Sequence, residues 1–107
     1  MCIRRSAAAG LGLLLACGFP ASATDRDTVS ALAAGCASCH GTEGRSPGAI
    51  PPLAGTPRAV LTAKLSAFKA GDDPDATIMS RIAAGYSDDE LEALARYFAN
   101  LTAEEEQ

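Results

Sequence analysis

Cys36-Ala37-Ser38-Cys39-His40 is the part of this sequence from which the rest can be interpreted. Cys-x-x-Cys-His is the attachment sequence of c-type haem. Two thiols three positions apart can each add to one vinyl group of a single porphyrin, and the next residue is then carried beneath the ring. The imidazole of His40 can therefore take one axial position on the iron. The motif predicts one covalently attached haem c.

Two other uses of a Cys-x-x-Cys pair fit the sequence less well. A thioredoxin-like redox pair needs a preceding strand in a βαβ setting, and the sequence before Cys36 contains no convincing strand. A structural zinc site needs four protein ligands. Beyond residue 23 the chain has two cysteines and one histidine, so zinc bound by a monomer would need an Asp or Glu as its fourth ligand.

The first 23 residues have the features of a secretory signal peptide. Arg4 and Arg5 give a positive start, and residues 7–19 form an apolar segment too short to span a bilayer. Pro20 interrupts this segment, and Ala-Ser-Ala at 21–23 is a small-residue cleavage site. The expected organisation is a cleaved signal peptide at 1–23 and one monohaem domain at 24–107, exported to the periplasm.

A second processing route remains open. Leu14-Leu15-Ala16-Cys17 resembles a bacterial lipobox, in which Cys17 is acylated and becomes the new N-terminus. Cleavage after Ala23 is the preferred interpretation, because leucine is not the usual residue at position 15 of such a motif. The protein is expected to contact a membrane only if Cys17 is lipidated.

The size and charge of the processed chain limit which partners it can bind and how large a core it can form. Cleavage after Ala23 leaves 84 residues, and the loss of Arg4 and Arg5 leaves 7 basic against 13 acidic side chains. Such a chain is not expected to bind nucleic acid, whose phosphates require Lys and Arg. Cys2 and Cys17 leave with the signal, so no disulfide is expected besides the haem-binding pair. A chain of this length without Trp is marginal for a self-sufficient core, and the porphyrin should supply part of it.

Apolar periodicity predicts an all-α fold with about four helices packed around the haem. The first helix, residues 24–37, begins at Thr24 or Asp25 and directs its apolar stripe into the motif. A loop rich in Gly and Pro follows at 41–55. The second helix, residues 56–70, begins with Thr56 as N-cap and ends at Gly71. The expected buried positions are Val29, Leu32, Ala33 and Cys36 in the first helix, and Val60, Leu61, Leu65 and Phe68 in the second.

Two further helices complete the expected fold. A short helix at 78–82 stops before Gly85, and a capping box of Ser87 with Glu90 starts the last helix. The last helix should bury one face, made of Leu91, Leu94, Ala95, Phe98 and Leu101. The three glutamates at 104–106 are interpreted as a frayed acidic end.

Met79 is the candidate for the second axial position on the iron. Once Met1 is removed it is the only methionine, and neither a second histidine nor a free cysteine remains. A methionine is more often a flexible filler of a core. However, His/Met ligation is the arrangement that raises the haem potential in electron-carrying cytochromes c. The predicted metal ligands are therefore His40 and Met79.

The loop at 41–55 contains the apolar run Ile50-Pro51-Pro52-Leu53, which is expected to pack against the haem edge. A metal-bound histidine usually donates its other ring N–H to a neighbouring acceptor. A proline carbonyl in this stiff loop is the natural acceptor for His40. The alternative is an ordinary rigid loop that does not contact the haem.

Residues 36–44 and 51–55 resemble the class I cytochromes of the c4 and c553 type. Residues 76–87, Ala-Thr-Ile-Met-Ser-Arg-Ile-Ala-Ala-Gly-Tyr-Ser, are similar to the haem domain in the cytochrome subunit of flavocytochrome c sulfide dehydrogenase. The resemblance implies haem attachment at Cys36 and Cys39 and axial ligands His40 and Met79. It also implies that Pro51 supplies the carbonyl for the axial histidine. The best-known subunit of that family has two haem domains, whereas this chain has one.

Three functions follow from these observations. The first is an electron-transfer subunit docked on an FAD flavoprotein that oxidises sulfide. The haem subunit would pass the electrons on to a soluble cytochrome or oxidase. The second is a freestanding carrier of the c551/c553 type for a terminal oxidase or reductase. The third, a haem-based sensor, needs an open sixth position, which Met79 argues against. No catalytic acid, base or nucleophile is predicted, so the chain itself is not expected to be an enzyme.

Overall fold

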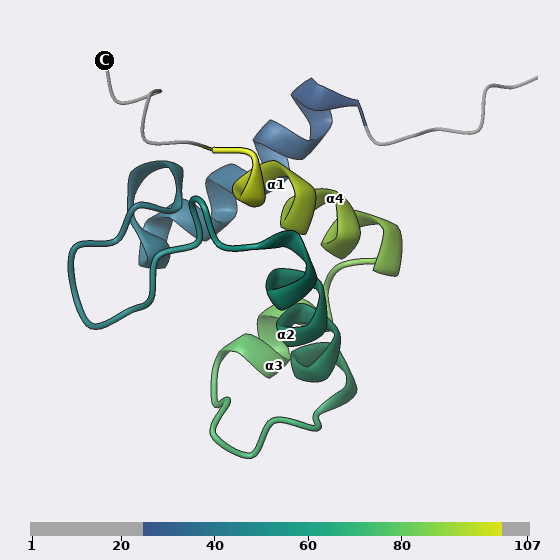
Figure 1. Cartoon of the computed structure of the whole chain (residues 1–107). Coiled ribbons are helices and arrows are strands. Elements are labelled where there is room, and N and C mark those ends of the chain that lie inside the picture. The colour runs from purple at the N-terminus through teal and green to yellow at the C-terminus, as the bar shows by residue number, and fades with distance from the viewer. Residues whose placement is uncertain (1–24, 102–107) are drawn as a thin grey trace, which may run out of the picture.

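The structure is a computed structural model that describes residues 25–101 (Figure 1). Its helices are α1 (Arg26–His40), the 3₁₀-helix η1 (Thr42–Gly44), α2 (Arg58–Ala70), α3 (Met79–Ala83) and α4 (Asp88–Ala99). There is no strand between residues 25 and 101, so the all-α prediction with four α-helices is confirmed. The predicted signal peptide, the alternative lipidation at Cys17 and the acidic end at 104–106 lie outside the described residues.

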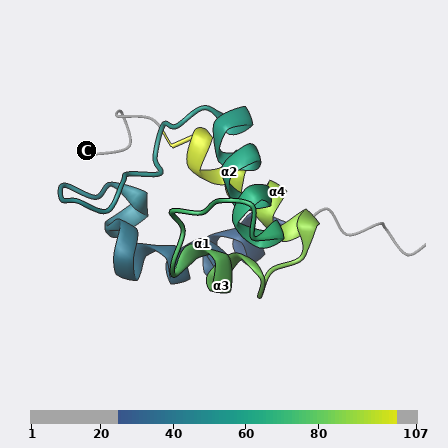
Figure 2. The same cartoon turned by 90° about the horizontal axis from the view of Figure 1, so that it is seen from below.

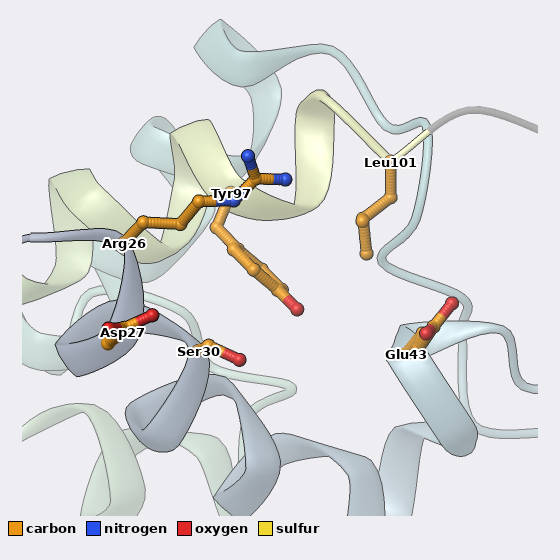
Figure 3. Close-up of a pocket in the computed structure, with 6 residues that line it drawn as sticks. All are labelled: Arg26, Asp27, Ser30, Glu43, Tyr97 and Leu101. Carbon is orange, nitrogen blue, oxygen red and sulfur yellow. The ribbon is translucent and has the colours of Figure 1, made fainter. Parts of the chain in front are cut away.

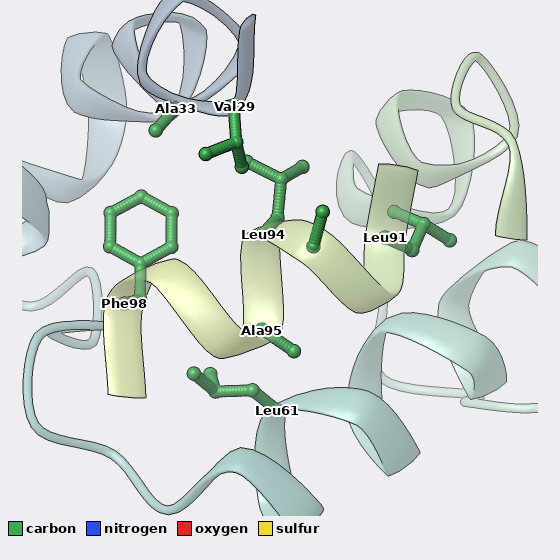
Figure 4. Close-up of a cluster of buried hydrophobic side chains, with 8 residues drawn as sticks. Val29, Ala33, Leu61, Leu91, Leu94, Ala95 and Phe98 are labelled. Atoms are coloured by element: carbon green, nitrogen blue, oxygen red, sulfur yellow. The ribbon is translucent and has the colours of Figure 1, made fainter. Parts of the chain in front are cut away.

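The core forms around α4, which packs against both α1 and α2, while α3 packs against α2 (Figures 1 and 2). In Figure 4, Leu94 points from α4 towards Val29 of α1, and Ala95 points towards Leu61 of α2. The buried apolar residues of the cluster are Val29, Ala33, Leu61, Leu91, Ala93, Leu94, Ala95 and Phe98. The predicted apolar faces of α1 and α4 are thus buried against each other. Leu101 lies beyond the end of α4 and is only partly buried.

Helix α1 continues through the whole motif instead of ending at residue 37 as predicted. Its N-cap is Asp25, whose carboxylate accepts a hydrogen bond of 2.7 Å from the backbone N–H of Thr28. That bond holds the pKa of Asp25 below its ordinary value. The helix ends only after His40, where Gly41 adopts a φ of +83° that suits glycine. The two cysteines and His40 are therefore held by one rigid helix end.

Helix α2 differs from the prediction at its start and on one face. Thr56 is not the N-cap, because its hydroxyl donates to the carbonyl of Pro52 at 3.4 Å and extended Pro57 takes the cap position. Val60 is 49% exposed, so its predicted burial is wrong. Helix α4 lies along the face that carries Leu61, and a residue one position away on a helix points about 100° aside. Gly71 ends the helix in a left-handed conformation, as predicted.

The predicted capping box at the start of α4 is present. Ser87 Oγ accepts from the backbone N–H of Glu90 at 3.1 Å, and the Glu90 carboxylate accepts from the backbone N–H of Ser87 at 2.8 Å. Farther along α4, Glu92 accepts hydrogen bonds from Arg58 and Thr62 of α2. The bond from Arg58 is the main reason that the pKa of Glu92 lies below its ordinary value. These contacts fix α4 against α2.

Gly44 fastens the long loop to the core. It is buried with a φ of +71°, and its carbonyl accepts from the backbone N–H of Leu53 at 2.7 Å and of Ala54 at 3.1 Å. A Cβ at this position would lie 2.8 Å from the ring of Phe98, closer than packed carbon atoms approach. The loop is thus closed at a point where only glycine fits.

Gly44→Ala is expected to lower the free energy of unfolding by about 2–4 kcal/mol, since it adds both overpacking and an unfavourable φ. Denaturant unfolding of the haem-loaded protein would measure the loss. Gly48→Ala is the matched control, because a Cβ there meets nothing within 4 Å. It should change stability by no more than about 0.5 kcal/mol. Equal effects of the two substitutions would contradict the proposed closure at Gly44.

Candidate haem-attachment site

The last turns of α1 bring the motif residues together on one helix end. Cys36 is partly buried, Cys39 is exposed, and both are free thiols. Residues three and four apart lie on the same side of a helix, so Cys36 shares a face with both Cys39 and His40. His40 is 9% exposed and is the buried polar residue of the described chain. This arrangement presents two thiols and one imidazole to the same region of space.

The hydrogen bond expected between His40 and a proline carbonyl is present. The Nδ1 atom of His40 lies 2.7 Å from the carbonyl oxygen of Pro51. Because a carbonyl can only accept, Nδ1 carries the proton and Nε2 keeps its lone pair for a metal. The loop that presents Pro51 is held to Gly44 through Leu53, so the ring orientation is fixed from outside the helix.

The surroundings of Cys36 argue against the redox and zinc alternatives. Burial raises the pKa of the Cys36 thiol, whereas reactive redox cysteines have a lowered pKa. Between residues 25 and 101, no group of three or more His, Cys, Asp or Glu side chains is arranged to hold a metal ion. Two free thiols beside an imidazole with an available Nε2 are instead the donor set of haem c. The residues present fit that group.

Met79 is the first residue of α3 and is partly buried. It follows the turn after α2, and α3 itself packs on α2. Ile78, directly before α3, is 66% exposed and Ile82 on α3 is 40% exposed, and Ile50 of the long loop is 44% exposed. Both the proline loop and the Met79 segment therefore carry exposed apolar side chains. Axial ligation by Met79 stays a prediction.

The structure adds Tyr86 and Gly35 to the residues around the motif. A Cβ built on Gly35 would lie 3.5 Å from the hydroxyl of Tyr86. Burial raises the pKa of Tyr86, and the neighbouring Cys36 raises it further. The sequence analysis assigned no role to Tyr86. A glycine in the middle of a helix, directly before the first cysteine, was the signal for a close neighbour.

The described chain also has a hollow of about 310 Å³ at the other end of α1 (Figure 3). Arg26, Asp27 and Ser30 of α1 line it together with Glu43, Tyr97 and Leu101. Its side chains carry both signs of charge and include none of the motif residues. This hollow is therefore separate from the attachment site.

The helices between residues 25 and 101 include none that is long and apolar enough to cross a membrane.

Comparisons with known proteins agree with this site. The family model for cytochrome c matches residues 28–102. A thiosulfate dehydrogenase electron acceptor from Stutzerimonas stutzeri (strain A1501) is 45% identical over 65% of this chain and 34% of its own length. A cytochrome subunit of sulfide dehydrogenase from Chlorobaculum tepidum is 39% identical over 66% of this chain and 64% of its own length. A cytochrome c-554(547) from Halothiobacillus neapolitanus is 37% identical over 64% of this chain and 86% of its own length.

Proposed function

This chain belongs to the cytochrome c family, and we propose that it is the haem subunit that accepts single electrons from a dehydrogenase in the periplasm. Membership in the family implies one covalently bound haem c and an electron-transfer role. The observation that best supports the proposal is the hydrogen bond between His40 and Pro51 beside two free thiols. This bond leaves Nε2 of His40 available to bind iron, next to the two cysteines that would hold the porphyrin.

The residues of this chain have distinct tasks in that role. The bound haem supplies an iron that gains and loses one electron at a time. Cys36 and Cys39 tether the porphyrin to α1, so the cofactor stays with the chain between encounters. His40 holds its position because the Pro51 carbonyl fixes its ring. A ligand whose position is fixed keeps the reorganisation energy of electron transfer small.

Met79 is proposed as the sixth ligand. A neutral thioether stabilises ferrous iron relative to ferric iron and so raises the reduction potential. Met79 is partly buried at the start of α3. If His40 and Met79 both bound the iron, no position would be open for a small ligand, and the protein would be suited to electron transfer, which disfavours the sensor hypothesis.

The proposed electron donor is the FAD-containing flavoprotein subunit of a sulfide dehydrogenase. The names of two relatives refer to a dehydrogenase, a thiosulfate dehydrogenase for one and a sulfide dehydrogenase for the other. The chain spans about a third of the first relative's length and 64% of the second's, so their activities come to it only as a proposal. Oxidation of the sulfur compound would belong to the partner chain, and the electrons would pass on to a soluble cytochrome or an oxidase.

A freestanding electron carrier is the second candidate. The relative named cytochrome c-554(547) is covered over 86% of its length, which makes it similar in extent to this chain. A carrier of that kind would meet its donor and acceptor only briefly. Charged groups around its docking surface would then speed association, and the rate would fall as salt rises.

The exposed apolar side chains favour a lasting complex. Ile50 on the proline loop and Ile78 and Ile82 on the Met79 segment are all exposed. They are available to the porphyrin and to a docking partner alike. The centre of a stable protein interface is depleted in charge, so we propose that the partner contacts the segments around Ser38, Ile50 and residues 78–86.

Purification of the native protein at moderate salt tests the choice between the two candidates. We expect the cytochrome to elute with a flavin-containing chain and its haem to become reduced when sulfide is added. Ile78→Lys should release the flavin-containing chain, while Val60→Lys, also at an exposed apolar residue, should not. A cytochrome that elutes alone, without sulfide-dependent reduction, would replace the subunit proposal with the free carrier.

A further inference from the structure

Tyr86 lies at the elbow between α3 and α4 and is fixed on both sides. Its backbone N–H donates to the carbonyl of Ala83, the last residue of α3, at 3.2 Å. The next residue, Ser87, is the N-cap of α4 and is held by the capping box. The side chain is partly buried and packs against the apolar core. The backbone at Tyr86 is therefore held between two helices.

From this elbow the ring of Tyr86 reaches across to α1. Its hydroxyl lies over Gly35, where an added Cβ would be 3.5 Å away. Cys36, the first attachment cysteine, is the next residue of α1 after this glycine. Glycine is an unfavourable choice inside a helix, but at this position it leaves room for the end of the ring. Tyr86 thus rests on the turn that carries the first attachment cysteine.

We propose that Tyr86 is a positioning residue that holds the Met79 segment at a fixed distance from the attachment turn. α3 begins at Met79 and leads into Tyr86 at the elbow, so a ring resting on α1 restrains the helix from its far end. The inference rests on the proposed ligation of iron by Met79. It assigns to Tyr86 the task of keeping the thioether within reach of the iron.

Competition with an added ligand reports on this restraint. Imidazole can bind ferric iron only when the thioether has left, so its apparent affinity depends on the fraction of molecules in the open state. A loosened Met79 segment raises that fraction. It should also weaken the far-red charge-transfer band that marks a thioether on ferric haem.

The test is an imidazole titration of the oxidised, haem-loaded protein. Tyr86→Ala should lower the apparent dissociation constant about tenfold and weaken the far-red band. Tyr86→Phe keeps the ring and should stay within about threefold of the unaltered protein. Gly35→Leu fills the space under the ring and should act like Tyr86→Ala. Gly35→Ala, which makes only an ordinary contact at 3.5 Å, should not.

Tyr97→Ala is the control for a merely structural effect. Tyr97 is also partly buried, and its ring packs edge-on against that of Phe98, with 5.2 Å between the ring centroids. It lines the hollow at the other end of α1. The Tyr97→Ala substitution should lower the melting temperature without changing the affinity for imidazole. Equal imidazole affinities in the two alanine variants would overturn the proposal for Tyr86. If Tyr86→Ala does not fold, Gly35→Leu against Gly35→Ala decides the question by the same titration.

Failure of the underlying ligand assignment would look different. If Met79→Ala leaves the far-red band in place, Met79 is not the ligand and the task assigned to Tyr86 is lost with it. If Met79→Ala removes the band but neither Tyr86→Ala nor Gly35→Leu changes imidazole affinity, the ligand assignment stands. In that case the positioning role of Tyr86 is wrong by itself.

Discussion

Met79→Ala is expected to remove the far-red charge-transfer band of the oxidised protein and to lower its reduction potential by more than about 100 mV. The band arises from sulfur bound to ferric iron, so it cannot survive loss of the thioether. The potential falls because the thioether stabilises ferrous iron more than ferric iron. Water or an added ligand would then take the open position.

Optical spectroscopy and a redox titration of the haem-loaded variant would measure both effects. Ile82→Ala is the matched control, since it removes an apolar side chain from the same short helix and leaves the thioether of Met79 in place. It should keep the band and shift the potential by no more than about 30 mV. A band that persists in Met79→Ala would show that another residue binds the iron.

Replacing both Cys36 and Cys39 with serine is expected to abolish covalent haem attachment and to leave the chain without a cooperative unfolding transition. Serine hydroxyls do not add to the vinyl groups in place of thiols. The described core is small and rich in alanine, with nine buried apolar residues of which four are alanines. A chain of this size depends on its cofactor for much of its buried apolar surface.

Acid-acetone extraction and the pyridine haemochrome spectrum would test the attachment, and circular dichroism during heating would test the fold. The unaltered protein should retain its haem through extraction and show the spectrum of two thioethers. Ser38→Ala, at the exposed position between the two cysteines, should behave like the unaltered protein. Haem that can be extracted from the unaltered protein would contradict the assignment of Cys36 and Cys39.

Much of the candidate site could be predicted from the sequence because its determinants are local. The thiol spacing, the adjoining His40 and the capping box at Ser87 each involve residues fewer than six positions apart. Such neighbours are placed by the helix geometry itself. The family resemblance then proposed Pro51 as the acceptor for His40, and the structure contains that hydrogen bond.

The errors concern the buried face of one helix and the ends of two helices. Periodicity placed Val60 in the core, but which face of α2 is buried depends on where α4 lies against it. Thr56 has the composition of an N-cap, yet the path of the proline loop turns its hydroxyl to Pro52. The end of α1 was predicted too early, because its last turn is continued by the motif and stopped by Gly41.

The sequence by itself therefore determined the helical class, the attachment motif and the order of the helices, since these follow from local spacing and backbone hydrogen bonding. Only the tertiary structure decided that Gly44 lies under Phe98 and that Tyr86 rests on Gly35. Each of these contacts joins segments far apart in the chain, and its formation depends on how the helices pack. Periodicity shows that a helix has an apolar face, but it does not specify which neighbour covers that face.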